Sequence, residues 1–395
     1  MRITTAQDLA AALRKCVGGE HIESAAPLTG VSLHGYRFPV DKPVRITGHF
    51  RADQRARNGW TNAVEVHQCA SIEFVDSHFE AVVVSEYERY ARGLYVERGE
   101  RIALRRCRLG DGNQGALINR VDGLAIEDCD FANLGNFGLQ GAVLKNFVLR
   151  RNIFRGFHLA FDPTLSAHVS PHGDAVQLMA VPGYEEGCER GLFEDNLIFC
   201  DPDNKVQGIY FQDLDDCALR AGRPHRDIHF KRDILLGAGW DALALDVAGG
   251  GLVIEDVQAL MIQGGRPAPS EPPGGQQVVE ARINIARKDG AEFRRSTASR
   301  LLLPGRYNAQ VEGFTVSPQI TLAQADQIAS AWLARHRKKS AATDPLMDEI
   351  ARLTAERGDL DAQRAAISRR IRQIDSRLRT LRRQAAAPIS GARAV

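Results

Sequence analysis

A short pattern repeats along this chain between about residue 60 and residue 260, and it constrains the fold more than any other feature. Each copy holds an alternating apolar run, a turn of glycine or polar residues, and a second run that ends in a small polar residue. The first runs occupy residues 62–67, 92–97, 114–119, 137–142, 174–179, 207–212 and 241–246, and the second runs 72–77, 102–107, 124–129, 147–152, 193–196, 230–233 and 254–257. A unit this short buries its apolar face only by stacking on copies of itself. The repeat therefore predicts an all-β solenoid, specifically a parallel β-helix.

The β-helix is predicted over residues 58–263, between segments of different pattern. Residues 1–57 combine an amphipathic helix with short strands, which we interpret as an N-terminal cap over the exposed strand edge of the first coil. Residues 264–318 hold a Pro/Gly loop followed by short strand-like pieces. Residues 319–395 are predicted to form an α-helical C-terminal module, which begins with a helix over residues 321–336.

The end of the chain carries a second kind of repeat. Residues 346–385 keep a four-three spacing of mostly apolar residues, which is typical of a coiled coil. This seam favours self-association through the C-terminal helices, with a homotrimer preferred over a dimer. Two alternatives stay open: a single helix packed on its own β-helix, and a helical hairpin broken at Gly358.

Composition excludes several classes of protein. A formal net charge of +2 does not indicate nucleic-acid binding, and no apolar run is long enough to insert into a membrane. The first residues read as a helix with Thr5 as its N-cap, so no signal peptide is expected. The seven scattered cysteines predict reduced thiols, with Cys107 and Cys129 stacked inside as small apolar side chains. No metal site and no cofactor are predicted.

The repeat also predicts a surface, because stacked coils place equivalent outward residues in columns about 4.8 Å apart. The longest insertions fall in the second half of the helix, where loops are expected to carry function. The outward positions there hold amides, carboxylates and an aromatic ring: Gln140, Gln177, Gln207, Tyr210, Gln212 and Asp246. Such groups pair with the hydroxyls of a sugar and cover its apolar face, so they predict a polysaccharide site. The alternative is that these strand positions are polar only because they meet water.

The candidate catalytic residues are His172, Asp174, Asp213 and Asp241. Asp174 and Asp241 lie two coils apart in one column, hence about 9 to 10 Å. This approaches the separation of about 6.5–9.5 Å that inverting glycosidases use between acid and base. Asp213 and Asp246 offer nearer pairings. A lyase would instead need a base that titrates near neutral pH, for which His172 is the candidate, with Arg220 or Lys205 neutralising a uronate.

Three segments, 172–177, 207–213 and 252–256, resemble coils of the right-handed parallel β-helix proteins of the pectate-lyase-like superfamily. Asn152, Asn196 and Asp233 stand where that family often stacks asparagine side chains at a turn. The resemblance implies polysaccharide lyases, glycoside hydrolases, epimerases and trimeric phage tailspikes as the activities to consider. The chain lacks the Asp-Pro-His-Asp motif of alginate epimerases and the Asp-Asp and Gly-His-Gly motifs of polygalacturonases, so no specific activity follows from the fold.

From these patterns we expect a bacteriophage tail spike or tail fibre, located in the virion, that recognises bacterial surface polysaccharide and carries residues able to cleave it. The missing export signal and the oligomerising helices favour this reading, which implies other virion proteins as partners. Two alternatives stay open. The chain is a stand-alone polysaccharide lyase or glycoside hydrolase, cytoplasmic or secreted by a non-classical route, or it is a purely structural virion protein.

Overall fold

The computed structural model describes residues 1–52, 61–81, 91–157, 173–200, 206–237, 241–263, 281–286, 291–303, 306–307 and 311–337. The chain divides into two compact units, Met1–Leu333 and Ala334–Val395. The first unit contains the β-helix. Of the second, only residues 334–337 are described, and they are the end of a helix. The heptad segment 346–385 therefore lies outside the described residues, and the trimer stays a prediction.

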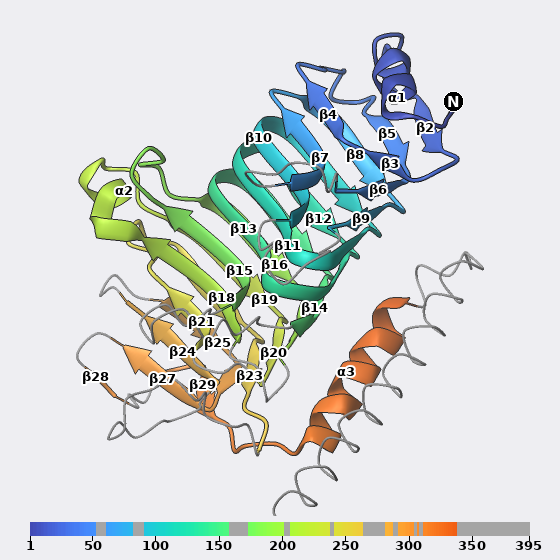
Figure 1. Cartoon of the computed structure of the whole chain (residues 1–395). Coiled ribbons are helices and arrows are strands. Elements are labelled where there is room, and N and C mark those ends of the chain that lie inside the picture. Colours follow the sequence, from blue (N-terminus) through green and yellow to red (C-terminus); the bar gives the residue numbers. More distant parts are fainter. Residues whose placement is uncertain are drawn as a thin grey trace, which may run out of the picture. The chain divides into compact units, whose positions relative to one another are not determined.

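The strands pair in parallel from coil to coil and wind around three faces, which we name A, B and C (Figure 1). Face A consists of β4 (Val31–His34), β7 (Thr61–His67), the first part of β10 (Ala91–Arg105), the later part of β11 (Arg108–Asp122), the middle of β13 (Asp130–Arg150), β15 (Gly173–Ala180), β18 (Val206–Asp213), β21 (Asp241–Leu245), β24 (Arg282–Ile285) and β27 (Arg300–Leu303), with the antiparallel β28 (Arg306–Tyr307). Face B consists of β1 (Arg2–Ile3), β2 (His21–Ser24), β5 (Val44–Thr47), β8 (Ala70–Val75), the end of β10, β12 (Ala125–Glu127), the end of β13, β16 (Glu189–Glu194), β19 (Arg226–Lys231), β22 (Leu252–Glu255) and β25 (Ala291–Arg294). Face C consists of β3 (Leu28–Thr29), β6 (His49–Arg51), β9 (His78–Glu80), the starts of β11 and β13, β14 (Ile153–Phe157), β17 (Leu197–Phe199), β20 (Ile234–Leu236), β23 (Gln258–Leu260), β26 (Ser296–Ala298) and β29 (Phe314–Val316).

The register of this ladder confirms the predicted parallel β-helix. Asp174 pairs with Gln207, and Gln177 pairs with Tyr210, as the alignment of the repeats requires. The ladder is longer than the predicted bounds of 58–263, because β2 already pairs with β5 and β26 still pairs with β29. The terminal coils use strands of two to four residues, which are too short to show an alternating pattern in the sequence.

The core is a stack of apolar side chains with aromatic rings at its centre. The rings of Phe131 and Phe154 stack at 4.5 Å, and those of Phe193 and Phe230 stack at 4.7 Å. All seven cysteines are free thiols, and Cys107 and Cys129 are buried in successive coils, as predicted.

A ladder of polar side chains fills the inside of the turn between faces B and C. The Nδ2 group of Asn152 donates to Oδ1 of Asn196, and Nδ2 of Asn196 donates to Oδ1 of Asp233. The same oxygen of Asp233 accepts from the backbone N–H of Asn196 at 2.9 Å. These bonds satisfy backbone groups that would otherwise be buried without partners, and they confirm the stacking expected of these three residues.

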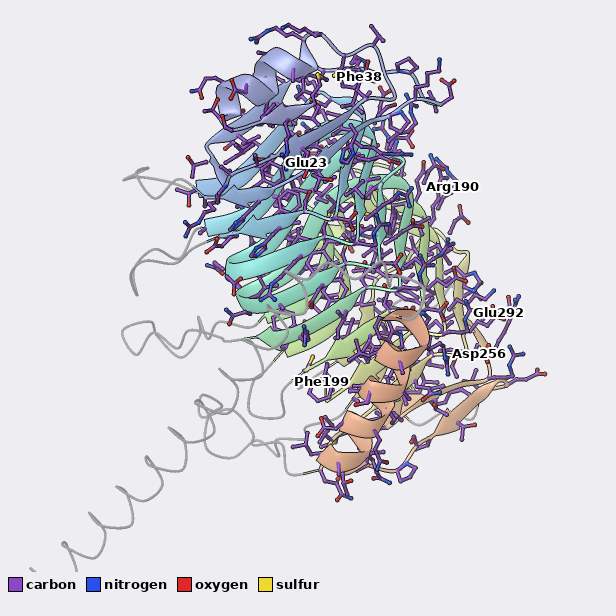
Figure 2. The ribbon with its side chains drawn as sticks, turned by 90° about the vertical axis from the view of Figure 1, so that its right-hand side faces the viewer. Glu23, Phe38, Arg190, Phe199, Asp256 and Glu292 are labelled. Carbon is purple, nitrogen blue, oxygen red and sulfur yellow. The ribbon has the colours of Figure 1, made fainter. Side chains whose placement is uncertain are left out.

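The outside of the same turn carries alternating charges. Its residues all have φ between 49° and 58°, in the left-handed region: Asp76, Arg106, Asp128, Arg151, Asp195, Arg232, Asp256 and Arg295. Each arginine holds the aspartate of the preceding coil through two hydrogen bonds, for example Arg151 to Asp128 at 2.6 and 2.7 Å. Figure 2 shows Asp256 at this edge, and Arg190 and Glu292 on the outer side of face B. The pairs explain how charged residues tolerate a backbone conformation that usually favours glycine.

Four helical segments accompany the strands in the described residues: α1 (Ala6–Leu13), the 3-10 turn η2 (Leu214–Asp216), α2 (Cys217–Arg220) and α3 (Leu322–Arg337). Thr5 caps α1 as predicted, since its hydroxyl accepts from the backbone N–H of Asp8 while the Asp8 carboxylate accepts from the N–H of Thr5. None of the helices in the described part of the chain is long and apolar enough to cross a membrane.

Helix α3 covers an apolar strip on the outside of face C. Ala325 and Trp332 are buried against Ile153, Leu197 and Leu236, and Phe199 lies at the margin of this cluster, beside α3 (Figure 2). The indole Nε1 of Trp332 donates to the backbone oxygen of Asp195 at 2.9 Å. The predicted helix over residues 321–336 is therefore confirmed.

We expect Trp332→Ala to lower the free energy of unfolding by about 3 kcal/mol, because it removes a large buried side chain and leaves a cavity. Trp332 is only 5% exposed, and its hydrogen bond to Asp195 is lost as well. Urea denaturation followed by circular dichroism measures the change. Leu322→Ala, at a position of α3 that is 46% exposed, is the matched control and should change stability by less than about 0.5 kcal/mol. Equal effects of the two variants would show that α3 is not docked through this face.

Candidate active site

One column of face A consists of small residues, which lie directly before the inward apolar run of each coil. Gly93, Gly115, Gly138, Ala175 and Gly208 follow the first outward residue of their coils. A Cβ added to Gly138 would lie 2.4 Å from the backbone oxygen of Ala175 and 2.7 Å from Cδ1 of Phe154, so this position also faces the core. The strand therefore turns two successive residues inward. The residue before this pair and the residue after it both point outward.

Contacts between side chains confirm this arrangement. The guanidinium of Arg92 lies over the ring of Tyr95, and Gln114 bonds to Gln140. Each contact joins the first outward column to the second. Asp174, Gln177, Gln207, Tyr210 and Asp241 occupy these same two columns in the following coils.

Asp174 has the most unusual environment among the described carboxylates. Its side chain is fully buried (0% exposed), and neither carboxylate oxygen has a hydrogen-bond partner among the residues that the structure describes. Burial without a partner disfavours the charged form and raises the pKa of Asp174 to about 7. This carboxyl group therefore keeps its proton to higher pH than an ordinary aspartate does, as a general acid requires.

Three carboxylates gather around Tyr210. Burial raises the pKa of its phenol, and the charges of Asp174, Asp241 and Asp246 raise the same pKa further. Tyr210 is thus surrounded by negative groups, and it is a poor candidate for a base because its phenolate form is disfavoured.

Asp241 has a partner, unlike Asp174. Its carboxylate forms an ion pair with Arg282 and a weaker contact, 3.4 Å, with Nδ2 of Asn284. It is 5% exposed and lies two coils from Asp174, with Gln207 on the coil between them. The strand spacing places the Cα atoms of the two aspartates about 9.6 Å apart. The buried Oε1 of Gln207 has no hydrogen-bond partner among the described residues, so it remains able to accept a hydrogen bond.

Asp213 does not join this group, contrary to the sequence-based expectation. It pairs with Ala180 at the end of β18, beyond Gln212. Its two oxygens accept hydrogen bonds at 2.9 Å from the backbone N–H groups of Ala218 and Leu219. Asp213 therefore holds the turn that contains η2 and α2, and we assign it a structural role.

The remaining predicted residues differ in how closely they approach Asp174 and Asp241. Gln212 pairs with Met179 in the third column, and its backbone oxygen accepts from Nε2 of the buried His225. Asp246 follows β21 and contributes to the negative field at Tyr210. His172 and Lys205 lie outside the described residues, and Arg220 lies on α2.

Some residues at this face were not predicted from the sequence. Arg282 was missed because the alignment of repeats ended near residue 260. Tyr184 follows β15 in an insertion, where no repeat predicts its direction. Its hydroxyl donates to Oε2 of Glu97 at 3.2 Å, and the guanidinium of Arg120 lies 4.2 Å from its ring centre. The turn that carries Tyr184 thus borders face A where its strands end.

Within the described residues, no cluster of three or more His, Cys, Asp or Glu side chains has the geometry to hold a metal ion.

No family model matches the chain, and no curated protein matches it. Among solved structures it is similar to an alginate lyase from Paenibacillus sp. (12% identity, TM-score 0.43), covering 81% of this chain and 96% of the other. It is also similar to a periplasmic alginate epimerase (11% identity, TM-score 0.40), covering 72% and 61%, and to a lacto-N-biosidase from Eubacterium ramulus (8% identity, TM-score 0.36), covering 79% and 63%. At these identities and TM-scores the similarities assign no activity to this chain.

Proposed function

We propose that face A binds a polysaccharide and hydrolyses it, with Asp174 as the general acid. The observation that carries the proposal is the fully buried carboxyl group of Asp174, which has no hydrogen-bond partner among the described residues and whose pKa of about 7 suits proton donation at neutral pH. Leaving a carboxyl group buried without partners lowers stability. Such a cost is common at functional sites, where perturbed groups are concentrated.

In the proposed reaction the Asp174 carboxyl group gives its proton to the glycosidic oxygen as the bond from that oxygen to the anomeric carbon breaks. Asp241 accepts a proton from a water molecule, and the oxygen of that water forms the new bond to the anomeric carbon. The Oε1 atom of Gln207, on the coil between them, is placed to accept the second hydrogen of this water. The Cα atoms of the two aspartates are about 9.6 Å apart, just above the range of about 6.5–9.5 Å that separates the two carboxyl groups in inverting enzymes and well above the roughly 5–5.5 Å of retaining enzymes. We therefore propose inversion at the anomeric carbon.

An elimination mechanism has less support from the described residues. A lyase needs a base and a cation beside the substrate carboxylate. The charges of three aspartates raise the pKa of the Tyr210 phenol instead of lowering it, and the nearby cation Arg282 is already paired with Asp241. The residues suggested for a lyase, His172 and Lys205, lie outside the described part of the chain.

The placement in a virion is a separate and finer proposal. It rests on the heptad segment 346–385 as an oligomerisation element, which lies outside the described residues, and on the resemblance to tailspikes. If the chain were a purely structural virion protein, we would expect no group of acidic side chains on face A. The grouping of Asp174, Asp241 and Asp246 around Tyr210 supports a glycan-acting protein over that alternative.

Incubation of the full chain with a panel of acidic, N-acetylated and neutral polysaccharides tests the proposal. Chain length is followed by size-exclusion chromatography, new reducing ends by a colorimetric assay, and unsaturated uronates by ultraviolet absorbance. We expect shorter chains and new reducing ends without ultraviolet absorbance. Shortening with new absorbance would establish a lyase and overturn the roles given to Asp174 and Asp241. Unchanged chain length for every glycan would overturn cleavage.

A further inference from the structure

A continuous chain of side-chain hydrogen bonds crosses four successive coils on the outer side of face A. Nε of Arg92 donates to Oε1 of Gln114 at 2.6 Å, and Nε2 of Gln114 donates to Oε1 of Gln140 at 3.0 Å. Nε2 of Gln140 then donates to Oε1 of Gln177 at 2.6 Å. Gln177 lies on β15, three residues from Asp174. The bond chain therefore begins at a cation and ends at the candidate active site.

Arg92 fixes the direction of every amide in this chain. A guanidinium group has only donors, so Gln114 must turn its oxygen toward Arg92 and its NH₂ group toward Gln140. The same requirement passes from Gln114 to Gln140 and from Gln140 to Gln177. Arg92, Gln114 and Gln177 are 8%, 1% and 5% exposed, so competing water is largely excluded from these positions.

The Nε2 group of Gln177, the last amide of this chain of hydrogen bonds, remains able to donate. The oxygen of Gln177 is engaged by Gln140, and no acceptor for its Nε2 group occurs among the described residues. A sugar hydroxyl both donates and accepts, so it pairs with an amide in either orientation. A carboxylate or an amide carbonyl only accepts, so it pairs with Gln177 only while the chain keeps its direction.

We propose that Arg92 orients Gln177 as a fixed hydrogen-bond donor beside Asp174, and that this donor selects glycans with an acceptor-only oxygen at that position. The group is the carboxylate of a uronic acid or the carbonyl of an N-acetyl group. The inference deepens the proposed function and rests on glycan binding at face A. Arg92 is a positioning residue, because three coils separate it from Gln177, about 14 Å by the strand spacing.

Reversing the charge at the start of the chain tests this role. In Arg92→Glu the new carboxylate only accepts, so each amide turns around and Gln177 presents its oxygen to the ligand. Arg98→Glu is the matched control, since it makes the same charge change on the same strand at an arginine whose side chain is 58% exposed. Binding of three oligosaccharides to the full chain is measured by calorimetry: oligogalacturonate, an N-acetylglucosamine oligomer and a neutral glucan oligomer.

We expect the wild type to bind at least one of the two acceptor-only probes more tightly than the glucan. Arg92→Glu should weaken binding of that probe about tenfold, as expected for one hydrogen bond. It should leave glucan binding within about twofold, and Arg98→Glu should change neither. The preferred probe also distinguishes a carboxylate from an amide carbonyl as the recognised group. If Arg92→Glu does not fold, Arg92→Gln removes the bias without a charge and should weaken binding about threefold.

A double substitution separates orientation from general damage. Gln177→Met removes the donor itself, so Arg92→Glu should have no further effect on binding in that background. The proposal is overturned if Arg92→Glu weakens glucan binding equally, if its effect persists in the Gln177→Met background, or if it matches Arg98→Glu. It is also overturned if the wild type binds none of the probes or shows no preference for an acceptor-only probe. Glycan cleavage is assayed separately on the same variants, so the failure of this inference and the failure of hydrolysis at Asp174 are distinguished by different measurements.

Discussion

Asp174→Asn is expected to reduce the rate of glycan cleavage by about 10²–10⁴-fold, the usual contribution of a general acid. Asparagine keeps the size of the side chain but has no proton to give to the leaving oxygen. Binding of the uncleaved glycan should remain within a few-fold of the wild type, because Gln177, Gln207 and Tyr210 are unchanged. Initial rates of reducing-end release, together with calorimetric binding, measure the two effects.

The same substitution should raise stability at neutral pH, because it removes a buried carboxyl group for which the described residues supply no partner. Glu292→Gln, which neutralises a carboxylate with a side chain 56% exposed on face B, serves as the control and should change neither rate nor stability appreciably. An Asp174→Asn variant with wild-type turnover would exclude Asp174 as the acid.

The second large effect is expected at Asp233, in the ladder inside the turn between faces B and C. Asp233 is 1% exposed, its Oδ2 has no hydrogen-bond partner within the described part of the chain, and burial raises its pKa to about 7. The unfolded chain releases this proton near pH 4, whereas the folded chain keeps it until about pH 7. The wild type should therefore lose stability as the pH rises from about 4 to 7, and its stability should level off above pH 7.

Asp233→Asn should remove the share of this loss that comes from Asp233, with a gain on the order of 4 kcal/mol above pH 7 and little gain near pH 4, while the share from the raised pKa of Asp174 remains. The new Nδ2 group would donate to the backbone oxygen of Phe193, as Asn196 donates to Leu149 in the preceding coil. Urea unfolding at pH 4.5 and pH 8 measures the difference. As a control, Asp195→Asn weakens the ion pair with Arg232 and should lower stability at pH 8. If Asp233→Asn is less stable than the wild type at pH 8, the account of this ladder is wrong.

Much of the fold is predictable from the sequence because each coil repeats the same arrangement of inward residues. The pairing of Asp174 with Gln207 and the stacking of Asn152, Asn196 and Asp233 follow directly from the alignment of coils. The terminal coils escape prediction because their strands are so short.

The candidate site is only partly predictable, because the sequence does not show the direction or the burial of individual side chains. Asp174 and Asp241 stand in the expected column, but strict alternation would turn that column inward. The column of small residues, of which Gly138 is an example, supplies the change in direction. Asp213 is similar to the others in sequence, yet the turn after β18 uses it to bind two backbone N–H groups. Burial is also invisible in the sequence, so nothing there distinguishes the unpartnered Asp174 from the ion-paired Asp241.

The measurement that tests the central claim most directly is the pH dependence of kcat/KM, between pH 5 and pH 9, on the glycan that the wild type shortens. A general acid acts only while it is protonated, so we predict that kcat/KM falls as the pH rises through about 7, the pKa of Asp174. Asp174→Asn should lose this fall along with most of its activity. A wild-type profile that stays flat from pH 6 to pH 8, or the same fall in Asp174→Asn, would contradict proton donation by Asp174.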